Sequence, residues 1–157
     1  IFLAFGLGSG LSPKAPGTAG SALSLVFFPL LCILGLWGSV AFIVVATLFG
    51  FWLCGKAADI LKVHDHEAIV WDEFVGQWIA LLPLLASATW NIQTYVGVIL
   101  AFILFRFFDI LKPWPISWCD KHLEGGFGIM VDDLLAGIAA GGIVWFIVSK
   151  NWLASLV

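Results

Sequence analysis

The feature that most constrains the fold is a series of long apolar runs along a chain of 157 residues. Each run approaches the roughly 20 residues with which a helix crosses the hydrocarbon core of a bilayer. Only 11% of the residues are charged, whereas soluble domains usually have about a quarter. We therefore expect an all-α fold, a polytopic membrane helix bundle with about five membrane-embedded helices. These helices should cover residues 20–36, 38–55, 68–86, 92–111 and 131–149.

The rest of the chain adds little to this bundle. Residues Ile1–Leu11 lack the basic flank and the cleavage site of a signal peptide, so we expect them to form an N-terminal interfacial segment. Because the sequence starts at Ile1 and not at Met, we also expect some N-terminal residues to be absent. The length leaves no room for a second domain, and residues 1–157 should form a single membrane-embedded domain.

Charged residues are distributed unevenly between the two ends of the predicted bundle. If five helices cross back and forth, the connections at 8–20, 56–67 and 112–130 share one membrane face. All 10 acidic residues and every basic residue except Lys150 lie on or near that face. The positive-inside bias places it on the cytoplasmic side. Anchoring helices does not require so many carboxylates, so the sequence predicts a polar site there.

Two predicted helices carry an aspartate above a stripe of small residues. Asp72 is followed by Gly76 four residues later, and Asp133 is followed in the same way by Gly137. Residues four apart lie on one face of a helix. Small residues mark helix–helix contacts in membranes, and ionised groups there face the bundle interior or a wet cavity. Both aspartates should therefore point into the bundle.

Three predicted helices bring carboxylates to a similar depth at this face. Carboxylates that converge without a cation repel one another, and an all-oxygen ligand set favours Mg²⁺, Mn²⁺ or Ca²⁺ over zinc. We expect Mg²⁺, because it typically binds through a few carboxylates and a substrate phosphate. The alternative is a set of interhelical salt bridges, such as one from Asp109 to Arg106 or Lys112. The predicted catalytic and metal-binding residues are Asp72, Glu73, Asp109, Asp132 and Asp133.

The segment from Gly8 to Ser21 is rich in glycine and leads into the first predicted helix. Backbone N–H groups at a helix N-terminus form a natural phosphate site, although a flexible entry loop explains the glycines equally well. Near the end of the fourth predicted helix, basic side chains share a face with Asp109. The predicted phosphate-binding residues are Lys14, Thr18, Ser21, Arg106 and Lys112.

Two histidines lie in the run His64-Asp65-His66-Glu67. A histidine there is a candidate general acid or base, because its pKa lies near neutral pH. Metal ligation by the run is an alternative, although alternating positions in a loop give it no helical geometry. Capping of a helix by Asp65 also remains open. His64 and His66 are therefore kept as possible acid–base residues.

Four motifs in order resemble the bacterial phosphatidylglycerophosphatase A family. They are Pro16–Ser21, Val63–His66 leading to Val70–Glu73, Phe105–Pro115, and Gly128–Asp133 with Ala136–Gly137. The resemblance implies a magnesium-dependent hydrolase of the bacterial inner membrane, with its active face towards the cytoplasm. Such an enzyme removes the terminal phosphate of phosphatidylglycerophosphate to give phosphatidylglycerol and inorganic phosphate. We expect this phospholipid as the partner and no nucleic acid, and the oligomeric state stays open.

Two other functions compete with lipid phosphate hydrolysis. A CDP-alcohol-type lipid phosphotransferase is also membrane-bound and metal-dependent, but it needs a DG and AR pair near its aspartates, which this sequence lacks. A cation or proton transporter would carry ionisable groups at several depths, whereas here they gather at one face. An aspartyl-phosphate intermediate is a mechanistic variant. It is disfavoured because the sequence has no DxDxT motif.

Overall fold

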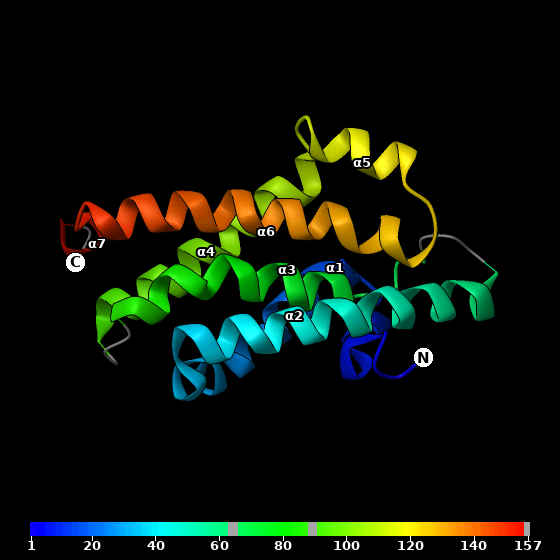
Figure 1. The fold of residues 1–157 in the computed structure, drawn as a ribbon, viewed down its shortest axis with the longest axis horizontal. Coiled ribbons are helices and arrows are strands. Elements are labelled where there is room, and N and C mark those ends of the chain that lie inside the picture. The colour runs from blue at the N-terminus through cyan, green and yellow to red at the C-terminus, as the bar shows by residue number, and fades with distance from the viewer. Residues whose placement is uncertain (63–65, 88–90, 156–157) are drawn as a thin grey trace.

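The computed structural model describes residues 1–62, 66–87 and 91–155. These residues form a bundle whose longer helices run along one axis, and they contain no strand (Figure 1). The predicted all-α class is therefore confirmed. In chain order the elements are the 3₁₀ helix η1 (Gly6–Leu11), α1 (Pro16–Ser24), η2 (Leu25–Phe27), α2 (Phe28–Leu61), α3 (Trp71–Leu81), η3 (Leu82–Ser87), α4 (Ile92–Leu111), α5 (Ile116–His122), α6 (Gly125–Ser149) and α7 (Trp152–Ser155).

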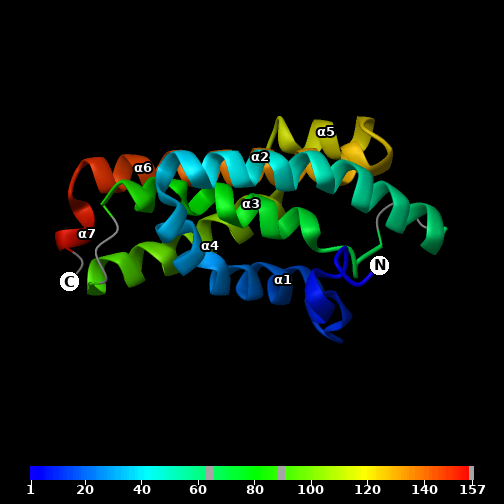
Figure 2. The same cartoon turned by 60° about the horizontal axis from the view of Figure 1, so that its bottom comes forward.

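The number of possible membrane spans differs from the prediction. Within the described residues, three helical stretches are long and apolar enough to cross a membrane: Pro16–Leu61, Ile92–Leu111 and Gly125–Ser149. The expectation of about five was therefore wrong. The first stretch contains two of the predicted runs, joined through helical turns with a break at Gly35, where φ is 66°. Near that break the chain turns back, so that α1 and most of α2 run in opposite directions (Figure 2).

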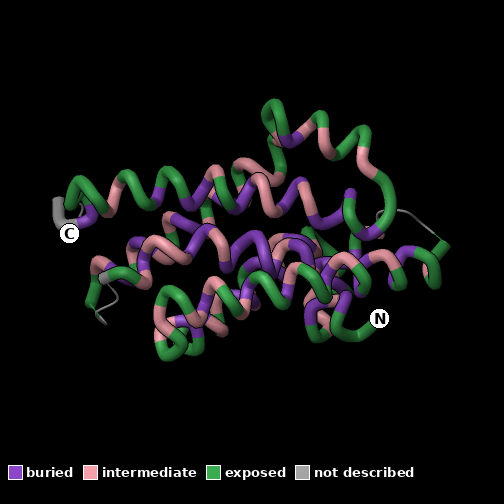
Figure 3. The backbone as a smooth tube through the Cα atoms, in the orientation of Figure 1, coloured by how far each residue is buried: buried purple, intermediate pink, exposed green. Residues whose placement is uncertain are grey.

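The third predicted run is shorter in the structure than in the sequence pattern. Its α-helical part, α3, has 11 residues and continues as the 3₁₀ helix η3. At about 1.5 Å per residue, α3 is too short to cross a hydrocarbon core of about 30 Å. It lies inside the bundle instead, where Phe74, Val75 and Trp78 are buried. Figure 3 shows the buried residues along α3.

The outer helices turn large apolar side chains outwards. Val45 on α2, Ile103 on α4 and Ile138 on α6 are each more than half exposed. Extended exposed apolar surface on a folded chain marks contact with a partner or a membrane. Together with the three candidate spans, this surface indicates membrane association.

The connections that carry most charges lie at one end of the bundle. The N-terminal segment, the end of α2, the start of α3, α5 and the start of α6 all lie there, while α7 lies at the opposite end (Figure 1). The N-terminal segment packs against the start of α3, since Ala4 is buried and its carbonyl accepts a hydrogen bond of 2.9 Å from the Val70 amide. Its interfacial position in a membrane stays a prediction.

Candidate active site

The charged end of the bundle contains a polar cavity of about 420 Å³. The N-terminal ends of α3 and α6, the C-terminal end of α4 and the start of α1 form its walls. All five carboxylates that the sequence singled out line this cavity, together with both basic residues from the end of α4. The lining residues are Ala15, Pro16, Gly17, Glu67, Ile69, Asp72, Glu73, Arg106, Asp109, Lys112, Asp132 and Asp133.

Two glycines let α3 and α6 approach closely beneath the cavity. A Cβ atom added to Gly76 would lie 2.6 Å from the carbonyl oxygen of Asp133, and one added to Gly137 would collide with the carbonyl of Gly76. Each glycine lies one helical turn after an aspartate, Asp72 or Asp133. The close crossing therefore brings these two aspartates together, which is the role that the small-residue stripes predicted.

Three carboxylates form the tightest acidic cluster in the described part of the chain. Asp72, Glu73 and Asp133 each offer one oxygen, and these oxygens all lie within 4.8 Å of one another. Among the described residues, Oε2 of Glu73 and Oδ2 of Asp133 are buried and have no hydrogen-bond partner. Buried anionic oxygens without partners are costly. Their chemistry and spacing fit a hard divalent cation such as Mg²⁺.

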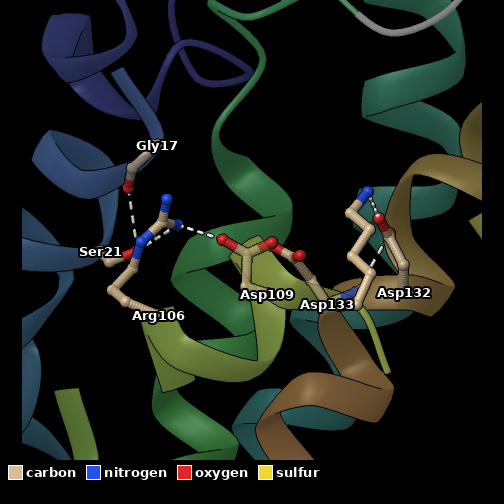
Figure 4. A network of polar contacts seen from close by, with 7 residues as sticks. Gly17, Ser21, Arg106, Asp109, Asp132 and Asp133 are labelled. Carbon is tan, nitrogen blue, oxygen red and sulfur yellow. Dashed lines mark hydrogen bonds and ion pairs between the residues drawn. The ribbon is translucent and has the colours of Figure 1, made fainter. Parts of the chain in front are cut away.

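The other two predicted carboxylates line the same cavity but form ion pairs. Asp109 pairs with Arg106, one turn before it on α4. Asp132 accepts a hydrogen bond of 2.7 Å from Nζ of Lys112. Figure 4 shows Asp109 beside Asp133. In this arrangement the salt-bridge interpretation describes Asp109 and Asp132, whereas the cation interpretation suits Asp72, Glu73 and Asp133.

Arg106 is held against α1 by a small polar network. Its Nη1 lies 3.4 Å from Oγ of Ser21, which in turn donates a hydrogen bond of 2.9 Å to the carbonyl of Gly17 (Figure 4). A Cβ atom at Gly17 would collide with the carboxylate of Glu73 and lie 3.2 Å from Nη1 of Arg106. Ser21 is fully buried and does not line the cavity. Ser21 therefore contacts Arg106 on the side away from the cavity.

Lys112 ends α4 in a left-handed conformation, with φ 43°. Its Nζ donates hydrogen bonds of 2.5 Å to Asp120 and 2.7 Å to Asp132. Burial lowers the pKa of Lys112, but its hydrogen bonds and charge interactions with these two carboxylates outweigh burial and raise the pKa above its ordinary value. The ammonium is therefore charged at neutral pH. Its ion pairs are present below the ordinary lysine pKa and are lost only as the pH rises beyond the higher folded-state value.

Besides Ser21, four predicted site residues are either not brought to the cavity wall or not described. Lys14 is exposed and Thr18 is half-buried, and neither lines the cavity. His66 accepts a hydrogen bond of 3.1 Å at Nδ1 from the Ala68 amide, and its ring stacks on Phe5. His64 lies outside the described residues.

Five cavity residues were absent from the predicted site, namely Ala15, Pro16, Gly17, Glu67 and Ile69, and two of them bear on its chemistry. Glu67 belongs to the run His64–Glu67, which was considered for metal binding, but only the fold shows that this end of the run reaches the cavity. Gly17 has no functional side chain, and its position in the Pro16–Ser21 motif was the available signal.

Comparison with known protein families gives a match over nearly the whole chain. The model of the family described as phosphatidylglycerophosphatase A matches residues 2–148, which include the entire cavity. The chain belongs to the phosphatidylglycerophosphatase A family. The resemblance seen in the four sequence motifs is thereby confirmed.

Three curated relatives align with most of the length of this chain. Phosphatidylglycerophosphatase A of Escherichia coli is 44% identical over 96% of this chain and 83% of its own. The protein of the same name from Haemophilus influenzae is 48% identical over 96% and 88%. A putative phosphatidylinositol-3-phosphatase of Bacteroides thetaiotaomicron is 40% identical over 88% and 86%. No solved structure matches the chain.

Proposed function

We propose that this chain is a Mg²⁺-dependent phosphatidylglycerophosphatase, which hydrolyses the terminal phosphomonoester of phosphatidylglycerophosphate to phosphatidylglycerol and phosphate. The observation that supports this most directly is the cavity itself. Oxygens of Asp72, Glu73 and Asp133 lie within 4.8 Å of one another, and Arg106 and Lys112 line the same space. A cation site beside two positive side chains suits a phosphate group. Two curated relatives carry the name of this activity.

Asp72, Glu73 and Asp133 would hold the magnesium ion, with Asp109 and Asp132 at the edge of the same cavity. When bound, Mg²⁺ would neutralise charge on the phosphate and lower the pKa of a bound water. These three carboxylates would place negative charge at the position where the cation binds. Glu73 and Asp133 each keep one buried oxygen that no described residue satisfies, which supports this role.

Arg106 and Lys112 would bind the phosphate oxygens. Both side chains carry positive charge into the cavity wall from the end of α4. Fixed positive groups stabilise charge on a transferring phosphoryl group without rearranging during the reaction. The partly buried hydrogen bond that Arg106 donates to Ser21 keeps the guanidinium in place. Ser21 would thus act through Arg106 and not touch the phosphate.

The position of the cavity suits a substrate that stays in the bilayer. It lies at one end of a bundle with three apolar stretches long enough to cross a membrane. A phospholipid whose acyl chains remain in the membrane would present its headgroup at this depth. Because nearly all basic residues lie at the same end, we place this face on the cytoplasmic side of a bacterial inner membrane.

The experiment that tests this function measures phosphate release from phosphatidylglycerophosphate by the purified protein in detergent. We expect release with Mg²⁺, none with excess chelator, and recovery when Mg²⁺ is restored. Phosphatidylinositol 3-phosphate serves as the comparison substrate, because one relative carries the name of that activity. Asp59→Asn, on an exposed residue of α2, is the matched control for later carboxylate variants. A folded protein that releases phosphate from neither lipid would exclude the proposal.

A further inference from the structure

An acidic residue outside the cavity holds one of the two cationic groups in its wall. Asp120 lies on α5, a short helix that Figure 1 shows at the margin of the bundle. Its Oδ1 accepts a hydrogen bond of 2.5 Å from Nζ of Lys112. The same Nζ is 2.7 Å from Oδ2 of Asp132, on α6. The ammonium of Lys112 is therefore held between carboxylates of two separate helices.

We propose that Asp120 is a positioning residue for Lys112 in phosphate binding, an inference that rests on the proposed function. A lysine ammonium has three N–H donors. Two are directed to Asp120 and Asp132, and this fixes the direction of the third. Asp132 alone would leave the ammonium free to turn about one contact and to move towards α6. The second contact removes that freedom and holds one N–H ready for a phosphate oxygen.

The position of α5 supports an effect on binding and not on folding. The Asp120 side chain is 35% exposed and that of Lys112 is 27% exposed. Exposed ion pairs contribute little to folding stability, because water and salt screen them. The buried anchor of α5 is Ile116, which is 3% exposed and does not depend on Asp120. Loss of the Asp120 carboxylate should therefore leave the fold intact and loosen Lys112.

The kinetic test compares wild type, Asp120→Asn, Asp120→Glu and the control Asp59→Asn with phosphatidylglycerophosphate at saturating Mg²⁺. We expect Asp120→Asn to raise KM about tenfold and to change kcat less than about threefold, because a charge-assisted hydrogen bond that orients a binding group is lost. Asp120→Glu should recover part of the lost affinity. The KM and kcat of Asp59→Asn should stay near the wild-type values. The melting temperature of every variant should also stay near that of the wild type. An unchanged KM in Asp120→Asn would overturn the proposal.

A double-mutant cycle asks whether Asp120 acts through Lys112. In a Lys112→Gln background, Asp120→Asn should have no further effect on KM, because the group that it positions is gone. Additive effects of the two substitutions would show that Asp120 acts by another route, and would overturn the proposal.

Binding of inorganic phosphate separates this proposal from the proposed function. Isothermal titration of the Mg²⁺-supplemented protein with inorganic phosphate needs no turnover. Asp120→Asn should weaken this binding about as much as it raises KM, again only when Lys112 is present. If the wild type hydrolyses no phosphatidylglycerophosphate yet shows this pattern, the proposed function fails and the role of Asp120 stands. Phosphate binding that is the same in wild type and Asp120→Asn overturns the role of Asp120.

Discussion

Two cavities formed by the described residues are similar in size, and α3 and α6 contribute to the walls of both. The polar cavity, of about 420 Å³, lies at the N-terminal ends of α3 and α6. The second, of about 480 Å³, lies further along the same helices and has apolar walls that include Ile79, Ile138 and Trp145. The close crossing at Gly76 and Gly137 lies between the two sets of lining residues in the sequence.

This comparison shows that cavity volume does not distinguish the candidate site. Six carboxylates and two basic side chains line the polar cavity, whereas none of the described residues that line the apolar one is ionisable. Four helical ends or connections meet at the polar cavity, and the apolar cavity is formed by helix sides and η3. Variants in the two cavities can show whether the reaction depends on the polar one alone.

Removal of a charge from the acidic cluster should give the largest effect. Glu73→Gln keeps the size of the side chain but removes a charged oxygen that no described residue satisfies. We expect a loss of about 10³-fold in kcat/KM, corresponding to about 4 kcal/mol of transition-state stabilisation. Phosphate release at saturating lipid and at several Mg²⁺ concentrations measures it. Asp72→Asn and Asp133→Asn should behave alike.

The matched control for Glu73→Gln lies on the same helix in the other cavity. Ile79→Val removes one methyl group from the apolar wall and should leave kcat/KM within about twofold, at a cost of about 1 kcal/mol in stability. Equal losses of activity in the two variants would show that α3 serves the reaction along its whole length. The reaction would then not depend on the polar cavity alone.

A substitution that disturbs the helix crossing beneath the acidic cluster should give the next largest loss of rate. In Gly137→Ala the new Cβ would meet the backbone carbonyl of Gly76, so α3 and α6 must move apart. A shift of about 1 Å at a reacting centre costs on the order of 10²-fold in rate. Gly142→Ala, five residues later on α6, places its Cβ in open space and should keep full activity. If Gly137→Ala matches Gly142→Ala in both kcat and melting temperature, the crossing does not position Asp133.

The crossing was predictable from the sequence because its signal is local. A glycine four residues after an aspartate shows in the sequence pattern for both Asp72 and Asp133, and the helical repeat then gives the shared face. The fold class and the family were predictable for similar reasons, since long apolar runs and ordered motifs are properties of the sequence alone.

Features that depend on tertiary contacts were not predictable. Hydropathy predicted a full membrane span at residues 68–86, but α3 is short. The residues before it, 66–70, are not helical and are tied to the N-terminal segment by the Val70–Ala4 hydrogen bond, and after Leu81 the chain continues as η3. Ser21 was expected to bind phosphate, yet the fold buries it behind Arg106, 85 positions along the chain. The contact from Lys112 to Asp120 depends on how α5 folds back, and no spacing rule indicates it.

Replacement of the guanidinium in the cavity wall should have an intermediate effect on kcat/KM. Arg106 contacts both Asp109 and Ser21 through one nitrogen, Nη1, while its side chain lines the cavity. Lysine keeps the charge but has a single terminal nitrogen, which cannot keep these contacts and also offer a phosphate the planar set of donors of a guanidinium, so Arg106→Lys should lower kcat/KM about tenfold. Steady-state kinetics measures it, and Ser21→Ala should reproduce a smaller part of the loss. Full activity in Arg106→Lys would mean that positive charge alone is needed at this position.

The smallest effect is expected where the apolar cavity is filled. Gly142 lines that cavity, and a Cβ atom added there meets no atom within 4 Å. Gly142→Leu should leave kcat/KM within about twofold, and a better helix former should raise stability by up to about 1 kcal/mol. Activity and melting temperature in the same detergent measure both effects. A tenfold loss of activity with an unchanged melting temperature would mean that this cavity takes part in the reaction, for instance by holding an acyl chain. The two cavities would then form one extended lipid site, and the acidic cluster would be only its polar end.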